Sequence, residues 1–163
     1  MLLITDEVQT GLGRTGKLMG YEWDDAKPDI VTLGKAISGG VTPVSGIVSM
    51  AEVMDTIKAG DHGSTYGGNP LGMAVAQAAI SALVDEGMIE NSAKMGALFK
   101  SKIEEINNPL IKEIRGRGLF VGVEFKHELP VDGNDFASIL REKGLLSKST
   151  HRHCVRFSPA LVI

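Results

Sequence analysis

Two short apolar segments, residues 2–5 and 30–33, constrain the fold of this 163-residue chain more than any other feature. Each consists of branched apolar residues and one threonine, and this continuous apolar character predicts strands of a buried, mainly parallel sheet. Asp6 directly follows the first segment, and Lys35 follows the second after one glycine. Because ligands of open α/β sheets bind at the carboxyl ends of the strands, Asp6 and Lys35 form a candidate site.

The remaining patterns predict an α/β part followed by a smaller α+β unit, with a boundary near residues 105–112. Asn69-Pro70 predicts the start of a helix that runs to about Asp85, since asparagine caps helices and proline is tolerated in the first turn. This helix is apolar nearly all round and is expected to be buried. Alternating apolar residues over 119–125 predict a half-buried strand. Further elements are expected as strands at 45–49, 145–148 and 155–157 and as helices at 51–58, 89–106 and 134–143.

Composition and charge argue against several classes of partner. The 17 Lys and Arg residues against 20 Asp and Glu give a net charge of −3, which suggests neither nucleic acid nor an anionic membrane as a partner. The longest apolar stretch, Leu71–Val84, is shorter than the ~20 residues of a membrane span. Cys154 is the only cysteine, so we expect a reducing compartment. Both ends of the chain lie in apolar runs, which predicts a segment of a longer protein.

Two patterns resemble ligand sites but are better explained otherwise. Residues 11–17, GLGRTGK, match a G-x-G-x-x-G pattern and the first seven positions of a P-loop. Leu18 replaces the hydroxyl residue that binds magnesium, and the following residues do not favour a helix, so we predict a flexible surface loop. A phosphate-binding module at Gly11–Lys17 remains the alternative from another class of protein. The loop with His151, His153 and Cys154 has too few ligands for a metal site, and none is predicted.

Asp6 and Lys35 together match a specific chemical need. A lysine amine can form a Schiff base with an aldehyde, and a carboxylate can keep a pyridine nitrogen protonated. Gln9 could donate a hydrogen bond to an oxygen on the same ring. The segment Ser64–Gly68 supplies hydroxyls and free backbone amides before a helix start, which suits an anion such as phosphate. Taken alone, that segment would be an ordinary turn.

Several stretches resemble the class III pyridoxal-phosphate aminotransferases in order and spacing. They cover essentially the whole chain and comprise TDEVQTG at 5–11, PDIV at 28–31, GKA at 34–36 and HGSTYGGNPL at 62–71. Within that family the resemblance is closest to the branch that uses ornithine. The discriminating stretches are TIKAGDHG at 56–63, LLSKSTH at 145–151 and VRFSPALVI at 155–163.

The resemblance implies a fold-type I architecture. Residues 1–108 would form part of the large cofactor-binding domain, a mainly parallel sheet with flanking helices, and residues 109–163 part of the small α+β C-terminal domain. Lys35 would hold pyridoxal 5′-phosphate covalently and move the substrate proton, while Asp6 would pair with the ring nitrogen and Gln9 with the phenolic oxygen. Arg156 would bind a substrate carboxylate. Thr65, with Ser64, would reach the phosphate of a cofactor held mainly by the partner subunit of a homodimer.

The resemblance also implies an activity. The parent protein would move the δ-amino group of ornithine to 2-oxoglutarate, with amino-acid and 2-oxo-acid substrates. A related enzyme acting on acetylornithine or 4-aminobutyrate remains the alternative. The cytoplasm and the mitochondrial matrix are both compatible locations. Because the chain resembles only the C-terminal part of the family, we expect residues 1–163 alone to be inactive.

Overall fold

The computed structural model describes all of residues 1–163 and divides into two compact units. The first comprises Met1–Gly13 and Lys17–Ile89, and the second comprises Arg14–Gly16 and Glu90–Ile163. The units therefore divide after residue 89, earlier in the sequence than the family-domain boundary expected after residue 108. The assignment of the two parts to family domains stays a prediction.

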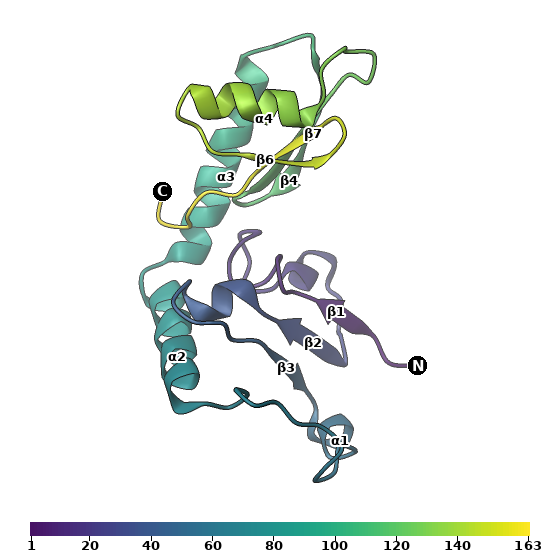
Figure 1. Ribbon diagram of the computed structural model, residues 1–163, viewed down its shortest axis with the longest axis vertical. Coiled ribbons are helices and arrows are strands. Elements are labelled where there is room, and N and C mark those ends of the chain that lie inside the picture. Colours follow the sequence, from purple (N-terminus) through teal and green to yellow (C-terminus); the bar gives the residue numbers. More distant parts are fainter. The chain divides into compact units, whose positions relative to one another are not determined.

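The first unit contains a three-stranded sheet in the order β1-β2-β3 (Figure 1). Strand β1 (Ile4–Asp6) runs parallel to β2 (Ile30–Leu33), whereas β3 (Gly46–Ser49) runs antiparallel to β2. The expectation of a mainly parallel sheet is therefore wrong for this chain, because the sheet is mixed. The connection from β2 to β3 holds only the short 3-10 helix η2 (Lys35–Ser38), without the crossover helix that a parallel pair normally requires.

Three further helices belong to the first unit: η1 (Gly20–Asp24), α1 (Ala51–Met54) and α2 (Pro70–Asp85). Helix α2 starts as predicted, since Asn69 Oδ1 accepts a hydrogen bond of 2.7 Å from Gly72 N. The prediction that α2 is buried is wrong. Only Gly72, Ala76 and Leu83 are buried, while Leu71 is 68% exposed. The helix packs against η2, and most of its residues are exposed.

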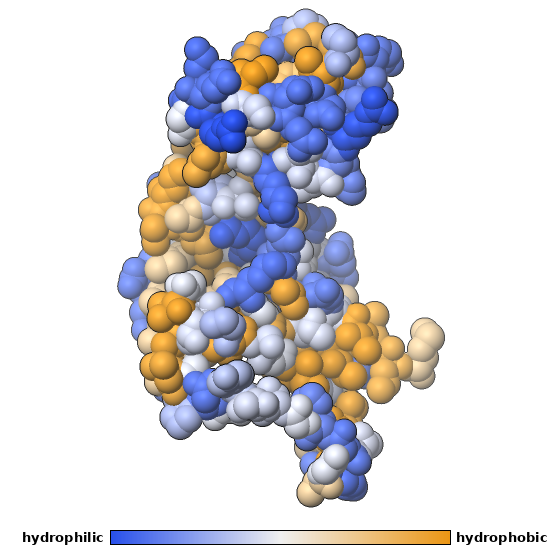
Figure 2. Space-filling model, in the orientation of Figure 1, coloured by the Kyte–Doolittle hydropathy of each residue, from blue (hydrophilic) through white to orange (hydrophobic).

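Of the strands in the first unit, only β2 has the buried apolar side chains expected of a parallel sheet, namely Val31 and Leu33. Strand β1 is largely uncovered, with Ile4 58% exposed, and β3 exposes Ile47 and Val48. Figure 2 shows apolar surface over the N-terminal strand and along α2. No single helix of the chain is long and apolar enough to cross a membrane, and only α2 and α3 taken together as a bent pair meet that test.

The second unit is built on a fully antiparallel sheet in the order β4-β5-β7-β6 (Figure 1). The predicted helices at 89–106 and 134–143 and the strand at 119–125 are confirmed. Strand β4 was not predicted, and β6 begins three residues later than expected. The elements are α3 (Met88–Glu105), β4 (Ile111–Arg117), β5 (Phe120–Phe125), α4 (Gly133–Glu142), β6 (Lys148–His151) and β7 (Cys154–Phe157).

One face of this sheet carries the core of the second unit. Val121, Val123 and Val155 are almost completely buried. Phe157, which pairs with Val121, makes an edge contact of 5.3 Å with Phe99 of α3. Phe125 lies on the same face and stacks at 3.7 Å on Phe136 of α4. Both helices thus cover one face, and the side chains at alternate positions, including Arg156, lie on the other.

Candidate functional site

The first candidate residues lie at the same edge of the first sheet. Asp6 is the last residue of β1, and Lys35 follows β2 after Gly34. The parallel register places Asp6 beside Thr32, three residues before Lys35. Both side chains are exposed. The carboxyl ends of two neighbouring parallel strands therefore bring an acid and an amine to one edge, as the strand pattern predicts.

The Asp6 carboxylate has one oxygen fixed and one oxygen free. Its Oδ1 accepts hydrogen bonds from Val8 N at 3.0 Å and from Thr32 Oγ1 at 3.2 Å. No protein group donates to Oδ2 in the structure. The side chain is consequently held in one orientation by its own strand and by the neighbouring strand, with an acceptor left for a ligand.

Lys35 has an unusual backbone conformation. Its φ is +46°, in the left-handed region that a residue with a Cβ adopts only at a cost. The turn is tight because Gly34 lies against Val8, where an added Cβ would be 3.2 Å from Cγ1. Ser38 Oγ donates a hydrogen bond of 2.9 Å to the Lys35 carbonyl oxygen and stabilises the turn. The amine itself forms no hydrogen bond or ion pair. Strain at such a residue is typical of a functional position.

No hydrogen bond joins the other predicted residues of this unit to Asp6 or Lys35. Gln9 follows β1 half-buried, and its side chain forms no hydrogen bond. Ser64 and Thr65 are exposed in the loop before α2, where Ser64 Oγ accepts a hydrogen bond of 3.1 Å from Gly67 N. Their roles toward a cofactor stay predictions.

Glu7 is a structural residue of this site that sequence reasoning missed. It is only 4% exposed, and its carboxylate accepts hydrogen bonds from Thr10 Oγ1 at 2.6 Å, Gly20 N at 2.9 Å and Tyr21 N at 2.8 Å. No local pattern identifies it, because two of its donors lie 13 and 14 residues further along the chain. Glu7, the residue after Asp6, thus joins the end of β1 to the segment that follows the glycine-rich loop.

The glycine-rich loop is not the flexible surface segment that we predicted. Gly11, Leu12, Gly13 and Thr15 are buried, and a Cβ added to Gly11 would lie 2.8 Å from the Glu7 carbonyl oxygen. The loop opens no helix, since η1 begins only at Gly20. A phosphate site of the P-loop type depends on such a helix, so the geometry does not favour the alternative function at residues 11–17.

Arg156, the predicted carboxylate ligand, lies on β7 of the second unit. Its guanidinium is 5.8 Å from the centre of the Phe120 ring, and its buried Nε has no hydrogen-bond partner. It forms no ion pair. The side chain borders two cavities of the second unit, of about 490 and 420 Å³. A half-buried guanidinium without an acid is suited to bind a carboxylate.

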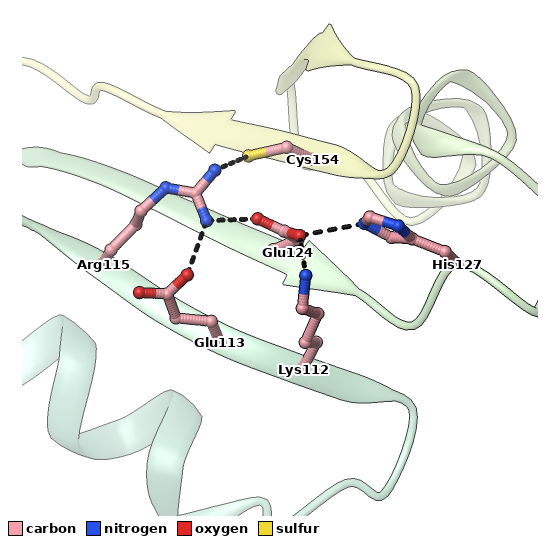
Figure 3. A network of polar contacts seen from close by, with 6 residues as sticks. All are labelled: Lys112, Glu113, Arg115, Glu124, His127 and Cys154. Atoms are coloured by element: carbon pink, nitrogen blue, oxygen red, sulfur yellow. Dashed lines mark hydrogen bonds and ion pairs between the residues drawn. The ribbon is translucent and has the colours of Figure 1, made fainter.

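Another arginine on the same sheet face, Arg115, is instead neutralised by acids (Figure 3). Its Nη1 donates to Glu124 and, at 2.9 Å, to Glu113, which raises its pKa. Lys112 and His127 also contact Glu124, at 2.7 and 2.9 Å. These three donors lower the pKa of Glu124 to about 2. This network stabilises the sheet and leaves Arg115 less available than Arg156 to an anion.

The histidines near Cys154 have contacts of their own. The His153 ring stacks at 4.7 Å on His127, and the Cys154 thiol lies 3.8 Å from Arg115 Nη2. No group of three or more potential metal ligands comes together in the chain.

The comparisons with known proteins agree on one family. The model of the class III aminotransferases matches residues 1–163. The ornithine aminotransferase of Brevibacillus brevis is 50% identical over all 163 residues, which correspond to 40% of that protein. The crystal structure of the Toxoplasma gondii ornithine aminotransferase superposes with a TM-score of 0.95 at 47% identity, over 100% of this chain and 39% of that one. An acetylornithine aminotransferase from Elizabethkingia anophelis gives 0.92 at 46% identity, over 100% and 43%. The chain thus spans about 40% of the length of the curated relatives it matches.

Proposed function

The chain belongs to the class III aminotransferases, and we propose that it forms part of an ornithine aminotransferase that uses pyridoxal 5′-phosphate. The observation that carries this proposal is the strained Lys35 at the end of β2 beside Asp6 at the end of the parallel strand β1. The relatives that support ornithine as amino donor are named ornithine aminotransferases. A solved structure of such an enzyme from Toxoplasma gondii is described with the cofactor at its active site.

The proposed reaction transfers the δ-amino group of ornithine to 2-oxoglutarate and yields glutamate 5-semialdehyde and glutamate. When bound, the cofactor withdraws electrons from the carbon that bears the amino group, so that this carbon can lose a proton. The residues present fit such a group, because Lys35 has an unpaired amine and Asp6 has an unpaired Oδ2. The proposed roles of both side chains follow from these two free atoms.

Asp6 Oδ2 would accept a hydrogen bond from the protonated ring nitrogen of the cofactor. The hydrogen bonds from Val8 N and Thr32 Oγ1 hold the carboxylate in place before any ligand arrives, so no reorientation is needed. A fixed negative charge at this position keeps the proton on the nitrogen and favours negative charge flowing into the ring.

Lys35 would hold the cofactor covalently and, once displaced by the substrate amine, carry the proton. The left-handed backbone of Lys35 and the close contact of Gly34 with Val8 fix the position of the Lys35 Cα and the direction in which its side chain leaves the backbone. The freed amine would take the proton from the substrate carbon that bears the amino group and would deliver it to the carbon on the other side of the shared nitrogen, C4′ of the cofactor. One residue therefore supplies both the attachment and the general base.

The other predicted ligands complete the proposal. Arg156 would bind a substrate carboxylate, and Gln9 would contact the phenolic oxygen of the cofactor. Ser64 and Thr65 are exposed, as residues that reach the cofactor phosphate of a partner subunit would be in a single chain. We also propose the homodimer that this sharing requires, and a location in the cytoplasm or the mitochondrial matrix.

A direct test measures semialdehyde formation by a protein of the relatives' full length that carries this chain. Ornithine, acetylornithine and 4-aminobutyrate are compared as donors with 2-oxoglutarate as acceptor. We expect kcat/KM to be highest for ornithine. Lys35→Ala should abolish most turnover, while the control Lys27→Ala, at an exposed lysine away from Asp6, should not. A preference for acetylornithine would overturn the donor assignment, and full activity of Lys35→Ala would overturn the mechanism.

A further inference from the structure

Three residues of the glycine-rich loop, Arg14–Gly16, belong to the second unit, although the chain on either side belongs to the first. Ser92 Oγ donates a hydrogen bond of 3.1 Å to the Arg14 carbonyl oxygen and accepts one of 3.2 Å from Leu119 N. The segment packs so closely that a Cβ added to Gly118 would lie 2.4 Å from the Thr15 carbonyl carbon. Arg14 therefore has a well-defined place beside the sheet of the second unit.

The side chain of Arg14 connects two neighbouring strands at the same end. Its Nη1 donates to the Leu119 carbonyl oxygen at 2.9 Å and to the Pro159 carbonyl oxygen at 2.6 Å. Leu119 immediately precedes β5, and Pro159 follows the end of β7 by two residues. Because β5 and β7 pair directly, a single nitrogen fixes the segment just beyond Arg156.

Neither Arg14 nor Arg156 has a carboxylate partner in the chain. Arg14 is half-buried, and its pKa is lowered by burial and by the positive charge of Arg156 nearby. Two cations close together, with no acid to compensate them, raise the positive potential around the Arg156 side chain. Arg115, on the same sheet face as Arg156, is different because Glu113 and Glu124 neutralise it.

We propose that Arg14 is a positioning residue for carboxylate binding by Arg156: it fixes the segment after β7 and adds an uncompensated positive charge near the bound anion. This inference rests on the proposed role of Arg156. It assigns a role to Arg14, which in the sequence is only one residue of a glycine-rich loop. The two contributions can be separated, since the hydrogen bonds require a donor at Nη1 and the potential requires only a charge.

The test uses the full-length holoenzyme and glutarate, a dicarboxylate that cannot accept an amino group. Arg14→Gln removes the charge and shortens the donor, and we expect the Kd of glutarate to rise roughly tenfold, on the scale of one hydrogen bond to a charged group. Arg14→Lys keeps the charge but lacks the donor at Nη1, so its Kd for glutarate should lie between those of the wild type and Arg14→Gln. The KM for 2-oxoglutarate should rise in parallel, with a smaller change in kcat. Arg141→Gln, at an exposed arginine of α4, is the matched control.

The salt dependence of glutarate binding separates an electrostatic role from a purely structural one. The Kd of the wild-type protein and of Arg14→Lys should rise more steeply with salt than that of Arg14→Gln. Wild-type affinity in Arg14→Gln, with weakened binding in Arg156→Gln, would overturn the inference and leave the proposed function intact. Equal losses and equal salt slopes in both Arg14 variants would overturn the charge contribution. Unchanged affinity in Arg156→Gln would instead overturn the proposed role of Arg156.

Discussion

Replacement of Glu7 by glutamine should locally destabilise residues 19–22 by about 2–4 kcal/mol without unfolding the protein. The wild-type carboxylate accepts hydrogen bonds from Thr10 Oγ1 and from the backbone N–H groups of Gly20 and Tyr21. Each hydrogen bond to a charged group contributes about 1.5–3 kcal/mol. Glutamine keeps one carbonyl oxygen but points its amide donors at a backbone donor, so one or two of these bonds are lost.

Amide hydrogen exchange of the full-length protein measures this loss directly. A local cost of about 2–4 kcal/mol corresponds to exchange roughly 30 to 1,000 times faster at Gly20 and Tyr21. The exchange rates of the β5 amides should not change in Glu7→Gln. In the control Glu52→Gln, which replaces an exposed acid of α1, the rates at Gly20 and Tyr21 should equal those of the wild type. Exchange at Gly20 and Tyr21 within about threefold of the wild type would refute the argument that the Glu7 carboxylate holds this loop.

The other predictions concern three different parts of the molecule. Asp6→Asn keeps the side-chain shape but loses the charge, so single-turnover kinetics should show proton removal slowed by orders of magnitude; an unchanged rate would contradict the role of Asp6. Gly96→Ala should lower the Tm by destabilising the protein by about 3 kcal/mol, whereas Gly46→Ala should not. A Cβ added at Gly96 would lie 2.0 Å from the Gly118 carbonyl oxygen, whereas a Cβ added at Gly46 has open space. Equal Tm values for the two variants would show that this packing does not matter. Because the pKa of Glu124 is about 2 in the folded state and 4.5 ordinarily, its ion pairs stabilise the fold above pH 4.5 and are lost as the pH falls toward 2. Denaturant titrations should therefore show a weaker acid dependence for Glu124→Gln.

Local patterns predicted the elements whose signals are continuous in sequence. The Asn69 cap gave the start of α2, and the alternation over 119–125 gave β5. Strand β4 was missed because its apolar residues, Ile111 and Ile114, are three apart and four of its other residues are charged. The register shift between Ile111 and Glu113 explains this spacing, since it breaks the two-residue period of the strand.

The exposure of α2 and β1 could not be predicted from the sequence. An apolar element can pack against other apolar elements, but its sequence does not show whether any of them lies beside it. For the candidate site, the position of Asp6 and Lys35 at one end of the sheet could be predicted because a strand end is a local feature. The contacts of Glu7 and Arg14, by contrast, are made with partners that are distant in sequence. The Arg14 side chain contacts Leu119 and Pro159, 105 and 145 residues away. No spacing within the glycine-rich motif contains this information.

In the proposed function, Lys35 is the residue that holds the cofactor covalently. Reduction of the full-length holoenzyme with borohydride makes this bond permanent, and proteolysis followed by mass spectrometry locates it. We expect one pyridoxyl group per subunit, on the peptide that contains Lys35, and no such peptide from Lys35→Ala. A pyridoxyl group on any other lysine, or a holoenzyme that borohydride leaves unlabelled, would show that Lys35 does not hold the cofactor.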